Sequence, residues 1–241
     1  MGKGYRGKTC AYCAEPFAST TADHVFGRGF FPPSERANLP KVPACANCNH
    51  EKSELEHYLM TVLPFGGRHA AANEMLTVYV PDRLTHNRAL HENLAAGRTV
   101  GRIDADGLLV AEMGIPLDSE KLDQLFEFIA KGLAFYHWGE PIPPDCNVRG
   151  GMIHPEVEHA LEALLALSGQ RVKANVGNGA FDYEAVRSVQ DPHITIWRFG
   201  VYGEMKVTDP KIPHALPCRM WVTSSQSPSI IAMLNDWRKE S

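Results

Sequence analysis

The sequence has no long apolar run, no internal repeat and no low-complexity segment. None of its apolar stretches approaches the roughly 18 to 20 residues that a transmembrane helix needs. Its first residues, MGKGYRGKTC, are basic but lack the apolar core of a signal peptide. These absences exclude a membrane protein, so we expect a cytoplasmic location and no membrane partner.

Basic residues are not in excess either, and the formal net charge is −4. This charge argues mildly against a nucleic-acid partner, but its distribution weakens the objection. Residues 1–52 carry seven Lys or Arg against four Asp or Glu, a net of +3, and the remainder carries −7. A local basic face decides whether a phosphate backbone can approach. Ordinary scatter would also explain an excess of this size.

What is present is the composition of a globular protein. The 241 residues are 44% hydrophobic and 22% charged, enough for one large domain or two small ones. The first fifty or so residues are rich in Gly, Pro and turn residues and have too little apolar material for a core of their own. A bound metal would supply the stability that burial cannot.

Hydrophobic periodicity predicts several helices. The segment NHEKSELEHYLMTVLPFG places Leu55, Tyr58, Leu59 and Val62 on one helical face, and Pro64 ends the helix. A second helix is expected over roughly residues 82–96. A long apolar helix follows in DSEKLDQLFEFIAKGLAFYHWG, with an N-cap at residue 118 or 119 and its end at residue 139. Residues 154–167 predict another amphipathic helix, and a helix capped near residue 227 closes the chain.

The strands predicted by the pattern lie mainly in the last third. Segments such as FDYEAVRSV and HITIWRFGVYG alternate apolar and polar residues, which is typical of an antiparallel sheet. Earlier, TVGRIDADGLLVAEM predicts a hairpin with Asp106 and Gly107 at its turn. The segment EPIPPDCNVRGG between them is interpreted as a linker. Trp197, Arg198 and Tyr202 would form a nucleic-acid platform or, more simply, pack within the sheet.

These elements predict an α+β fold with an N-terminal metal finger, a helical middle, and a C-terminal antiparallel sheet with flanking helices. The corresponding regions are residues 1–65, residues 66–150 with the hairpin, and residues 151–241, whose role the pattern does not indicate.

Six cysteines fall into two classes. Cys146 and Cys218 are isolated and are expected to be buried apolar residues. The other four form two C-x2-C pairs separated by 31 residues, namely Cys10, Cys13, Cys45 and Cys48. Four thiolates are the ligand set of a closed structural zinc site, and they leave no open position for water. Two unrelated redox or free pairs are the alternative.

The residues between the two pairs resemble a known family. Asp23 and His24 form a D-H dipeptide, an N-L step starts at Asn38, and the second cysteine pair continues as C-A-N-C-N-H-E-K through Lys52. This ordered set is similar to that of the HNH (His-Me finger, ββα-metal) endonucleases. The resemblance covers about residues 8–55 and implies a zinc-bound ββα-metal finger.

The resemblance also implies roles for individual residues. His24 would be the general base that activates water, and Asn38 would orient it. Asp23 and Asn49 would hold a catalytic divalent ion, Mg²⁺ or Mn²⁺, with His50 as the alternative to Asn49. Each of these residues also has an ordinary structural role open to it, as a cap, a turn or a solvated side chain.

Two basic side chains complete the expected site. Lys52 and Arg28 would contact the phosphate backbone of the nucleic acid.

The expected function is therefore that of a metal-dependent HNH endonuclease that hydrolyses phosphodiester bonds, with DNA as the partner, in a restriction, phage or antiviral-defence context. Double-strand cleavage would require a homodimer. The alternative is a non-catalytic zinc module that binds nucleic acid or protein.

Overall fold

The computed structural model describes residues 4–105, 108–153, 155–166, 168–203, 205–207, 216–217 and 219–240. Its helices are α1 Ala46–Val62, α2 Ala70–Glu74, α3 Val80–His86, α4 Arg88–Gly97, α5 Ser119–Trp138, α6 Pro155–Leu165 and α7 Pro228–Glu240, with shorter helical turns at Arg28–Phe30, Pro33–Glu35, Leu63–Gly66 and Met75–Tyr79. Its strands are β1 Thr21–His24, β2 Lys41–Ala44, β3 Thr99–Ala105, β4 Leu108–Gly114, β5 Asn147–Met152, β6 Gly169–Val176, β7 Phe181–Ser188, β8 Thr195–Val201, β9 Lys206–Val207, β10 Leu216–Pro217 and β11 Arg219–Ser225.

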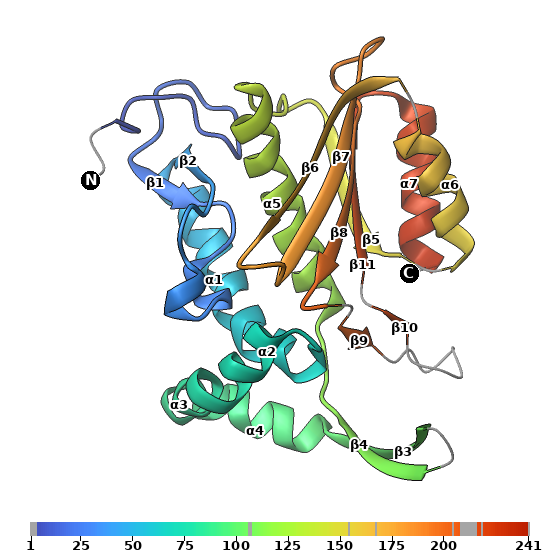
Figure 1. The fold of residues 1–241 in the computed structure, drawn as a ribbon. Coiled ribbons are helices and arrows are strands. Elements are labelled where there is room, and N and C mark those ends of the chain that lie inside the picture. Colours follow the sequence, from blue (N-terminus) through green and yellow to red (C-terminus); the bar gives the residue numbers. More distant parts are fainter. Residues whose placement is uncertain are drawn as a thin grey trace.

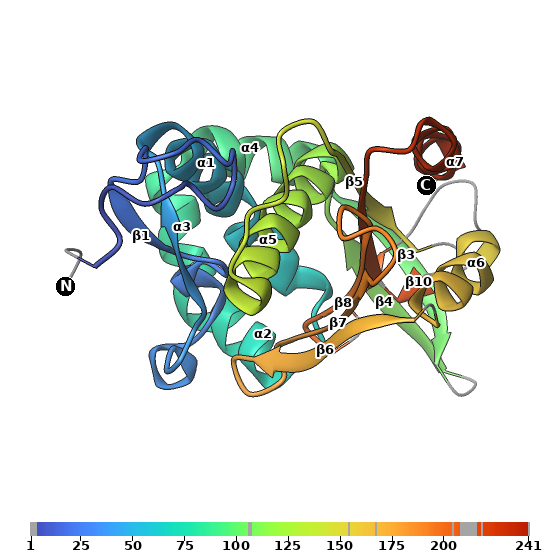
Figure 2. The same ribbon diagram turned by 90° about the horizontal axis from the view of Figure 1, so that it is seen from above.

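The C-terminal half is built on a five-stranded sheet of order β5-β11-β8-β7-β6, in which every neighbouring pair is antiparallel. Side chains alternate between its two faces. Trp197 and Phe199 belong to the main core, whereas Ile196 and Trp221 belong to a smaller cluster with residues of α6. Figures 1 and 2 show α5 on one face of the sheet and α6 and α7 on the other. The expectation of an antiparallel sheet with helices around it is confirmed, and Trp197 and Tyr202 are fully buried packing residues.

The long helix α5 lies between the sheet and the N-terminal region (Figure 1). Its ends are where the sequence predicts them. The Asp118 side chain accepts a hydrogen bond from the Lys121 backbone, and Gly139 closes the helix with φ +78°, a conformation that favours glycine. Leu122, Phe126 and Ile129 are among its fully buried residues.

Two segments differ from the sequence prediction. The expected linker contains β5, which pairs with β11 as an edge strand of the sheet. Its two adjacent glycines hid the alternating pattern, and Gly151 packs so closely on the ring of Trp221 that a Cβ would lie 3.0 Å from Nε1. The helix expected over residues 82–96 is two helices, because Asn87 interrupts it and caps α4 through a hydrogen bond from the Leu90 backbone.

The predicted hairpin is present as β3 and β4, which project from the lower end of the molecule in Figure 1. Its predicted turn at Asp106 and Gly107 lies outside the described residues, as do Cys218 and the ends of the predicted helix at His154 and Leu167. None of the helices in the described ranges has both the length and the apolar character of a membrane span.

One hydrophobic core runs across the three predicted regions. Tyr12 and Phe26 from the N-terminal region, Ile129 from α5, and Phe181 and Phe199 from the sheet belong to a single buried cluster. Strand β5 also spans the expected boundary at residue 150. The N-terminal region therefore obtains its apolar packing from the rest of the chain.

The loop that follows β1 is held from two directions. The hydroxyl of Tyr202, beyond β8, donates a buried hydrogen bond of 2.5 Å to the carbonyl of Phe30. The guanidinium of Arg83, on α3, donates to the carbonyls of Gly29 (2.8 Å) and Met60 (2.5 Å). Gly177, in the turn between β6 and β7, packs against the ring of Phe31 so closely that a Cβ would collide with it. Distant segments thus determine the course of this loop.

The Tyr202 contact gives a first prediction. Tyr202→Phe leaves the buried Phe30 carbonyl without its partner, so we expect the free energy of unfolding to fall by about 1–3 kcal/mol. Urea denaturation followed by tryptophan fluorescence measures the loss. Tyr136→Phe is the control, because Tyr136 is 51% exposed. Equal unfolding midpoints for the two variants would show that the hydrogen bond does not support the loop.

Candidate functional site

The two C-x2-C pairs come together at one end of the N-terminal region. The Sγ atoms of Cys10, Cys13, Cys45 and Cys48 all lie within 4.8 Å of one another. A tetrahedral zinc ion with Zn–S bonds of about 2.3 Å places its sulfurs about 3.8 Å apart, and the Cys13 and Cys45 sulfurs are 3.9 Å apart. The four cysteines can therefore hold a metal ion such as zinc.

Backbone N–H groups point at these sulfurs. The Cys45 N–H donates to the Cys10 sulfur (3.3 Å), and the Cys48 N–H donates to the Cys45 sulfur (3.5 Å). Burial acts to raise the pKa of the Cys10 thiol, but backbone hydrogen bonds, first that of Cys45, outweigh it and lower the pKa. Burial and the neighbouring thiols raise the pKa of Cys48 well above its ordinary value. All four cysteines can be deprotonated together only if a bound cation offsets their negative charges.

The cysteine cluster sits beside a small ββα unit. Strands β1 and β2 pair antiparallel, with His24 opposite Lys41 and Asp23 opposite Val42. Helix α1 follows β2 directly, and Cys45 caps it through its sulfur. The second cysteine pair therefore joins β2 to α1, and the first pair lies before β1.

Strand alternation separates the two residues of the D-H dipeptide. Val42, opposite Asp23, is fully buried, whereas Lys41, opposite His24, is exposed. Because directly opposed residues of an antiparallel pair share a face, Asp23 lies on the inner face of the hairpin and His24 on the outer face.

Lys52 occupies the centre of the inner face. Its side chain is 1% exposed, and its ammonium lies 3.1 Å from Oδ2 of Asp23 and in contact with Oε1 of Glu56. It also donates a hydrogen bond of 2.9 Å to the backbone carbonyl of His24. Tyr12 donates a further hydrogen bond of 2.5 Å to Oδ2 of Asp23. These residues are called the Lys52 cluster below. The expectation that Lys52 contacts a phosphate does not fit this placement, because its three donors already face oxygen atoms inside the protein.

The Lys52 cluster contains two carboxyl groups, those of Asp23 and Glu56, and one ammonium group. Burial raises the pKa of Glu56, while the Lys52 ammonium opposes that rise. The Glu56 carboxylate packs directly on Gly27, where a Cβ would lie 2.6 Å from its carboxyl carbon. Glycine at this position thus lets the carboxylate reach the ammonium.

His24 is half-buried at the end of β1. Burial lowers the pKa of its imidazole below the ordinary value, and the positive charges of Lys41 and Arg28 act in the same direction. Nothing in the described part of the chain hydrogen-bonds to its ring nitrogens. The imidazole is therefore neutral near pH 7, which is the state that accepts a proton.

Asn38 does not make the contact expected of it. It is exposed, and no hydrogen bond links it to His24 among the described residues. Its φ of +60° lies in the left-handed region, which asparagine tolerates better than most residues. The left-handed turn before β2 is by itself a structural reason for an asparagine at this position. That Asn38 orients His24 therefore stays a prediction.

The two expected ligands of a catalytic ion lie on facing elements. Asp23 is 14% exposed, and hydrogen bonds from described residues reach its Oδ2 only. Asn49 is half-buried in the first turn of α1, one turn before Lys52, whereas His50 is exposed and lies 3.6 Å from Glu54. This placement favours Asn49 over His50. Within the described ranges, the cysteines are the one group of three or more metal-binding His, Cys, Asp or Glu side chains.

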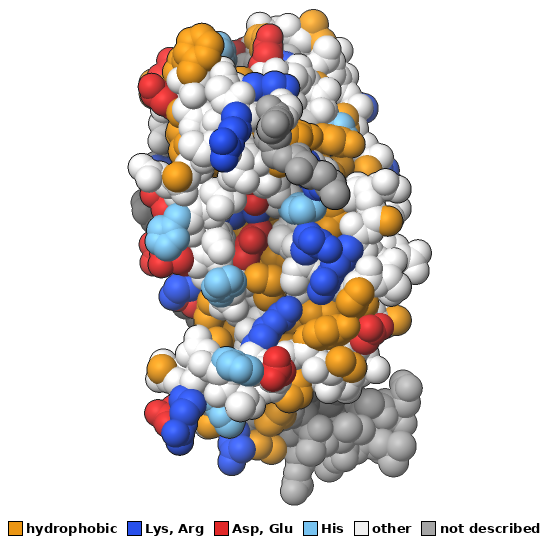
Figure 3. Space-filling view, turned by 90° about the vertical axis from the view of Figure 1, so that its left-hand side faces the viewer, with side chains coloured by type: hydrophobic (Ala, Val, Ile, Leu, Met, Phe, Trp, Pro, Cys, Tyr) orange, Lys and Arg blue, Asp and Glu red, His pale blue; other side chains and the backbone are white. Residues whose placement is uncertain are grey.

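Two exposed basic side chains, Lys41 and Arg28, lie near enough to His24 for their charge to act on its imidazole. Arg28 is exposed in the helical turn after β1, and no ion pair engages it in the described ranges. Figure 3 views the molecule from the side of the N-terminal region, where histidine and Lys or Arg side chains gather around a hollow with acidic side chains in it. This side of the molecule therefore carries exposed charges of both signs.

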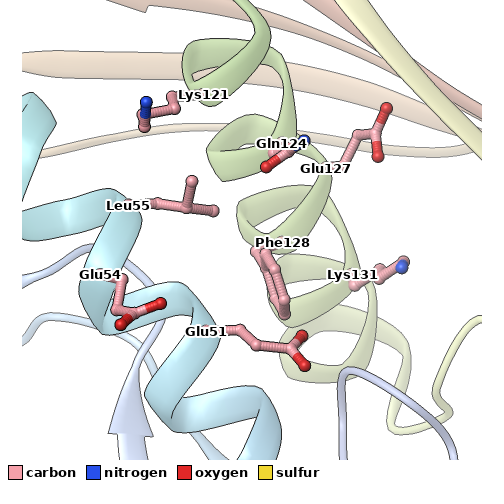
Figure 4. Close-up of a pocket in the computed structure, with 8 residues that line it drawn as sticks. All are labelled: Glu51, Glu54, Leu55, Lys121, Gln124, Glu127, Phe128 and Lys131. Atoms are coloured by element: carbon pink, nitrogen blue, oxygen red, sulfur yellow. The ribbon is translucent and has the colours of Figure 1, made fainter.

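A pocket of about 400 Å³ lies elsewhere, between α1 and α5 (Figure 4). It is lined by Glu51, Glu54, Leu55, Lys121, Gln124, Glu127, Phe128 and Lys131. None of the residues predicted for the site lines it, and its three carboxylates outnumber its two lysines.

Sequence reasoning missed three neighbours of the predicted residues. Tyr12 and Glu56 belong to the Lys52 cluster, and Lys41 lies opposite His24. Glu56 follows Lys52 by four residues, a spacing that brings side chains together on a helix, so it was accessible from the sequence. The other two depend on how β1 pairs and packs.

No protein-family profile matches the chain, and searches of curated proteins and of solved structures find no significant match. The resemblance to HNH endonucleases therefore rests on the motif residues alone.

The cysteine cluster gives a second prediction. We expect about one zinc ion per chain by elemental analysis, and its loss in Cys45→Ser together with a clear fall in melting temperature. Cys146→Ser is the control, because Cys146 is a buried cysteine that lies outside the cluster. Unchanged zinc content in Cys45→Ser would refute a four-cysteine site.

The Lys52 cluster gives a third prediction. Lys52→Met keeps the buried stem but leaves two carboxylates without their cation, so we expect a loss of about 3–5 kcal/mol in the free energy of unfolding. Burial already raises the pKa of Glu56 in the folded state, so the folded variant favours the protonated acid. The loss should therefore be smaller at about pH 5.5 and grow toward about pH 8.

Lys131→Met, on α5, is the control for this comparison, because in the described ranges no carboxylate pairs with Lys131. A loss in Lys52→Met that equals that of the control, or that shrinks as the pH rises, would contradict the assignment of a buried charge cluster.

Proposed function

We propose that this protein is a metal-dependent endonuclease of the HNH type that hydrolyses phosphodiester bonds of DNA. The observation that carries the proposal is the position of His24, half-buried at the end of β1 in a ββα unit beside four clustered cysteines, with its imidazole held neutral by burial and two nearby cations. A neutral imidazole at the edge of a basic surface is suited to take a proton from water next to a phosphodiester.

His24 acts as the general base in this proposal. One ring nitrogen accepts the proton of the attacking water as its oxygen bonds to phosphorus and the bond to the leaving oxygen breaks. The imidazolium that forms is destabilised by Lys41 and Arg28, so it readily releases the proton to solvent. The backbone of His24 stays in place because Lys52 holds its carbonyl. Arg28 contacts the phosphate backbone, which its exposure and lack of an ion-pair partner among the described residues permit.

Asp23 and Asn49 would hold a divalent cation at the seam between β1 and α1. The donor set fits Mg²⁺ or Mn²⁺, since both side chains offer hard oxygen atoms and Oδ1 of Asp23 has no hydrogen-bond partner among the described residues. Because Asp23 and His24 lie on opposite faces of the hairpin, the ion would have to meet the phosphate at the end of β1, where the two residues adjoin. There it would supply positive charge to the scissile phosphate and its leaving oxygen. The cysteines hold a separate zinc ion whose duty is structural.

We place this activity in a restriction, phage or antiviral-defence context, in which one finger cuts one strand and two copies of the chain are needed for a double-strand break. A non-catalytic zinc module that binds nucleic acid or protein is the competing proposal, and the experiment below separates the two.

The role of His24 as general base gives a fourth prediction. Supercoiled plasmid incubated with the protein and Mg²⁺ or Mn²⁺ should be nicked, and His24→Ala should lower the rate by about 10²- to 10⁴-fold. His24 must be neutral to act, and its pKa lies below the ordinary value of 6.5. The rate should therefore rise with pH below about 6.5 and be level above it.

His159→Ala is the control, because His159 is exposed on α6 and far from the ββα unit in the chain. Equal nicking by wild type and His24→Ala would exclude His24 as the base. DNA binding that survives in both proteins, with no nicking under either metal, would establish the non-catalytic module instead.

A further inference from the structure

Lys41 differs from the other basic residues of the ββα unit in its position relative to His24. The two residues are direct partners in the antiparallel pairing of β1 and β2. Cross-strand partners have Cβ atoms about 4.5–5.5 Å apart and project from the same face. The Lys41 side chain therefore starts beside the imidazole, on the outer face of the hairpin.

The ammonium of Lys41 is available to a partner molecule. Lys41 is exposed, and neither an ion pair nor a hydrogen bond engages its side chain within the described ranges. Lys52 is the opposite case, since its ammonium is buried against Asp23 and Glu56. Of Lys41 and Lys52, only Lys41 can reach an external anion.

The charges around Lys41 favour an anion over a cation. Lys41 and Arg28 are the two residues whose positive charge disfavours protonation of His24 most strongly. The nearby acids Asp23 and Glu56 face inward and are neutralised in part by Lys52. An anion at the outer face therefore meets two free cations and no unpaired carboxylate from the inner face.

We propose that Lys41 is a phosphate-contacting residue of the nuclease site and holds the nucleic-acid backbone beside His24 on the outer face of the β1–β2 hairpin. This inference rests on the proposed function for its substrate class, a polyanionic nucleic-acid backbone. Lys41 takes the role that the sequence suggested for Lys52. A lysine acts there as a point charge on a flexible stem, so it contacts backbone phosphates without reading bases.

The test measures binding of a fluorescent DNA duplex by anisotropy over a range of salt concentrations, in the His24→Ala background so that no cleavage occurs. One phosphate contact contributes about 0.9 to the slope of log K against log salt. Lys41→Gln should reduce the slope by about that amount and weaken binding at about 50 mM salt by on the order of tenfold. Lys41→Arg should restore both, because the charge is kept.

Lys173→Gln is the matched control, because Lys173 is also exposed and on a strand, β6, but lies in the C-terminal sheet. Zinc content and melting temperature of each variant establish that the fold is kept. An unchanged slope in Lys41→Gln, or a change equal to that of Lys173→Gln, would overturn the inference. A slope change in Lys41→Arg as large as that in Lys41→Gln would overturn it too.

Nicking by the wild-type protein separates this inference from the proposed function. If wild type nicks plasmid and the Lys41→Gln slope is unchanged, the inference fails and the function stands. If wild type binds DNA through Lys41 but does not nick under Mg²⁺ or Mn²⁺, the inference stands and the nuclease proposal fails.

Discussion

The position of β1 against α1 depends on one buried ammonium group. Lys52 joins the Asp23 carboxylate, the Glu56 carboxylate and the backbone carbonyl of His24 from a site with almost no access to water. Such a charge is costly to bury unless each donor finds an oxygen, and here two of the oxygens come from β1 and the third from Glu56, one turn further along α1. The geometry of the candidate site, from the direction of His24 to the inward turn of Asp23, follows from this arrangement.

The N-terminal region is short of apolar residues, and two kinds of support replace a core of its own. At one end, four cysteines come close enough to share a metal ion. At the other, the loop after β1 is held by residues far away in the chain, through the Tyr202 hydroxyl, the Arg83 guanidinium and the turn at Gly177. Helix α5 fills the space between this region and the sheet. The helical middle and the C-terminal sheet thus serve as the scaffold of the candidate site.

The hairpin divides charge between its two faces. Its inner face carries paired charges that stabilise the fold, while its outer face carries His24 between the free cations Lys41 and Arg28. Because interactions in a buried site are screened less than those in water, the inner charges fix geometry and the outer charges remain available to a ligand. This division leaves two exposed positive charges beside His24 in a chain whose net charge is −4.

Local pattern alone determined several features of this protein. The spacing of the cysteine pairs indicated a metal site, the caps at Asp118 and Gly139 set the ends of α5, and alternation in the last third predicted the antiparallel sheet. These features are readable because each depends on residues close together in the chain. Which way Lys52 points, which residue lies opposite His24, and the pairing of β5 despite its glycines were decided only by tertiary structure. The reason is physical. A lysine side chain can be buried only where oxygen atoms from other parts of the chain accept its hydrogen bonds. Strand register is set by packing between segments that are far apart in the sequence.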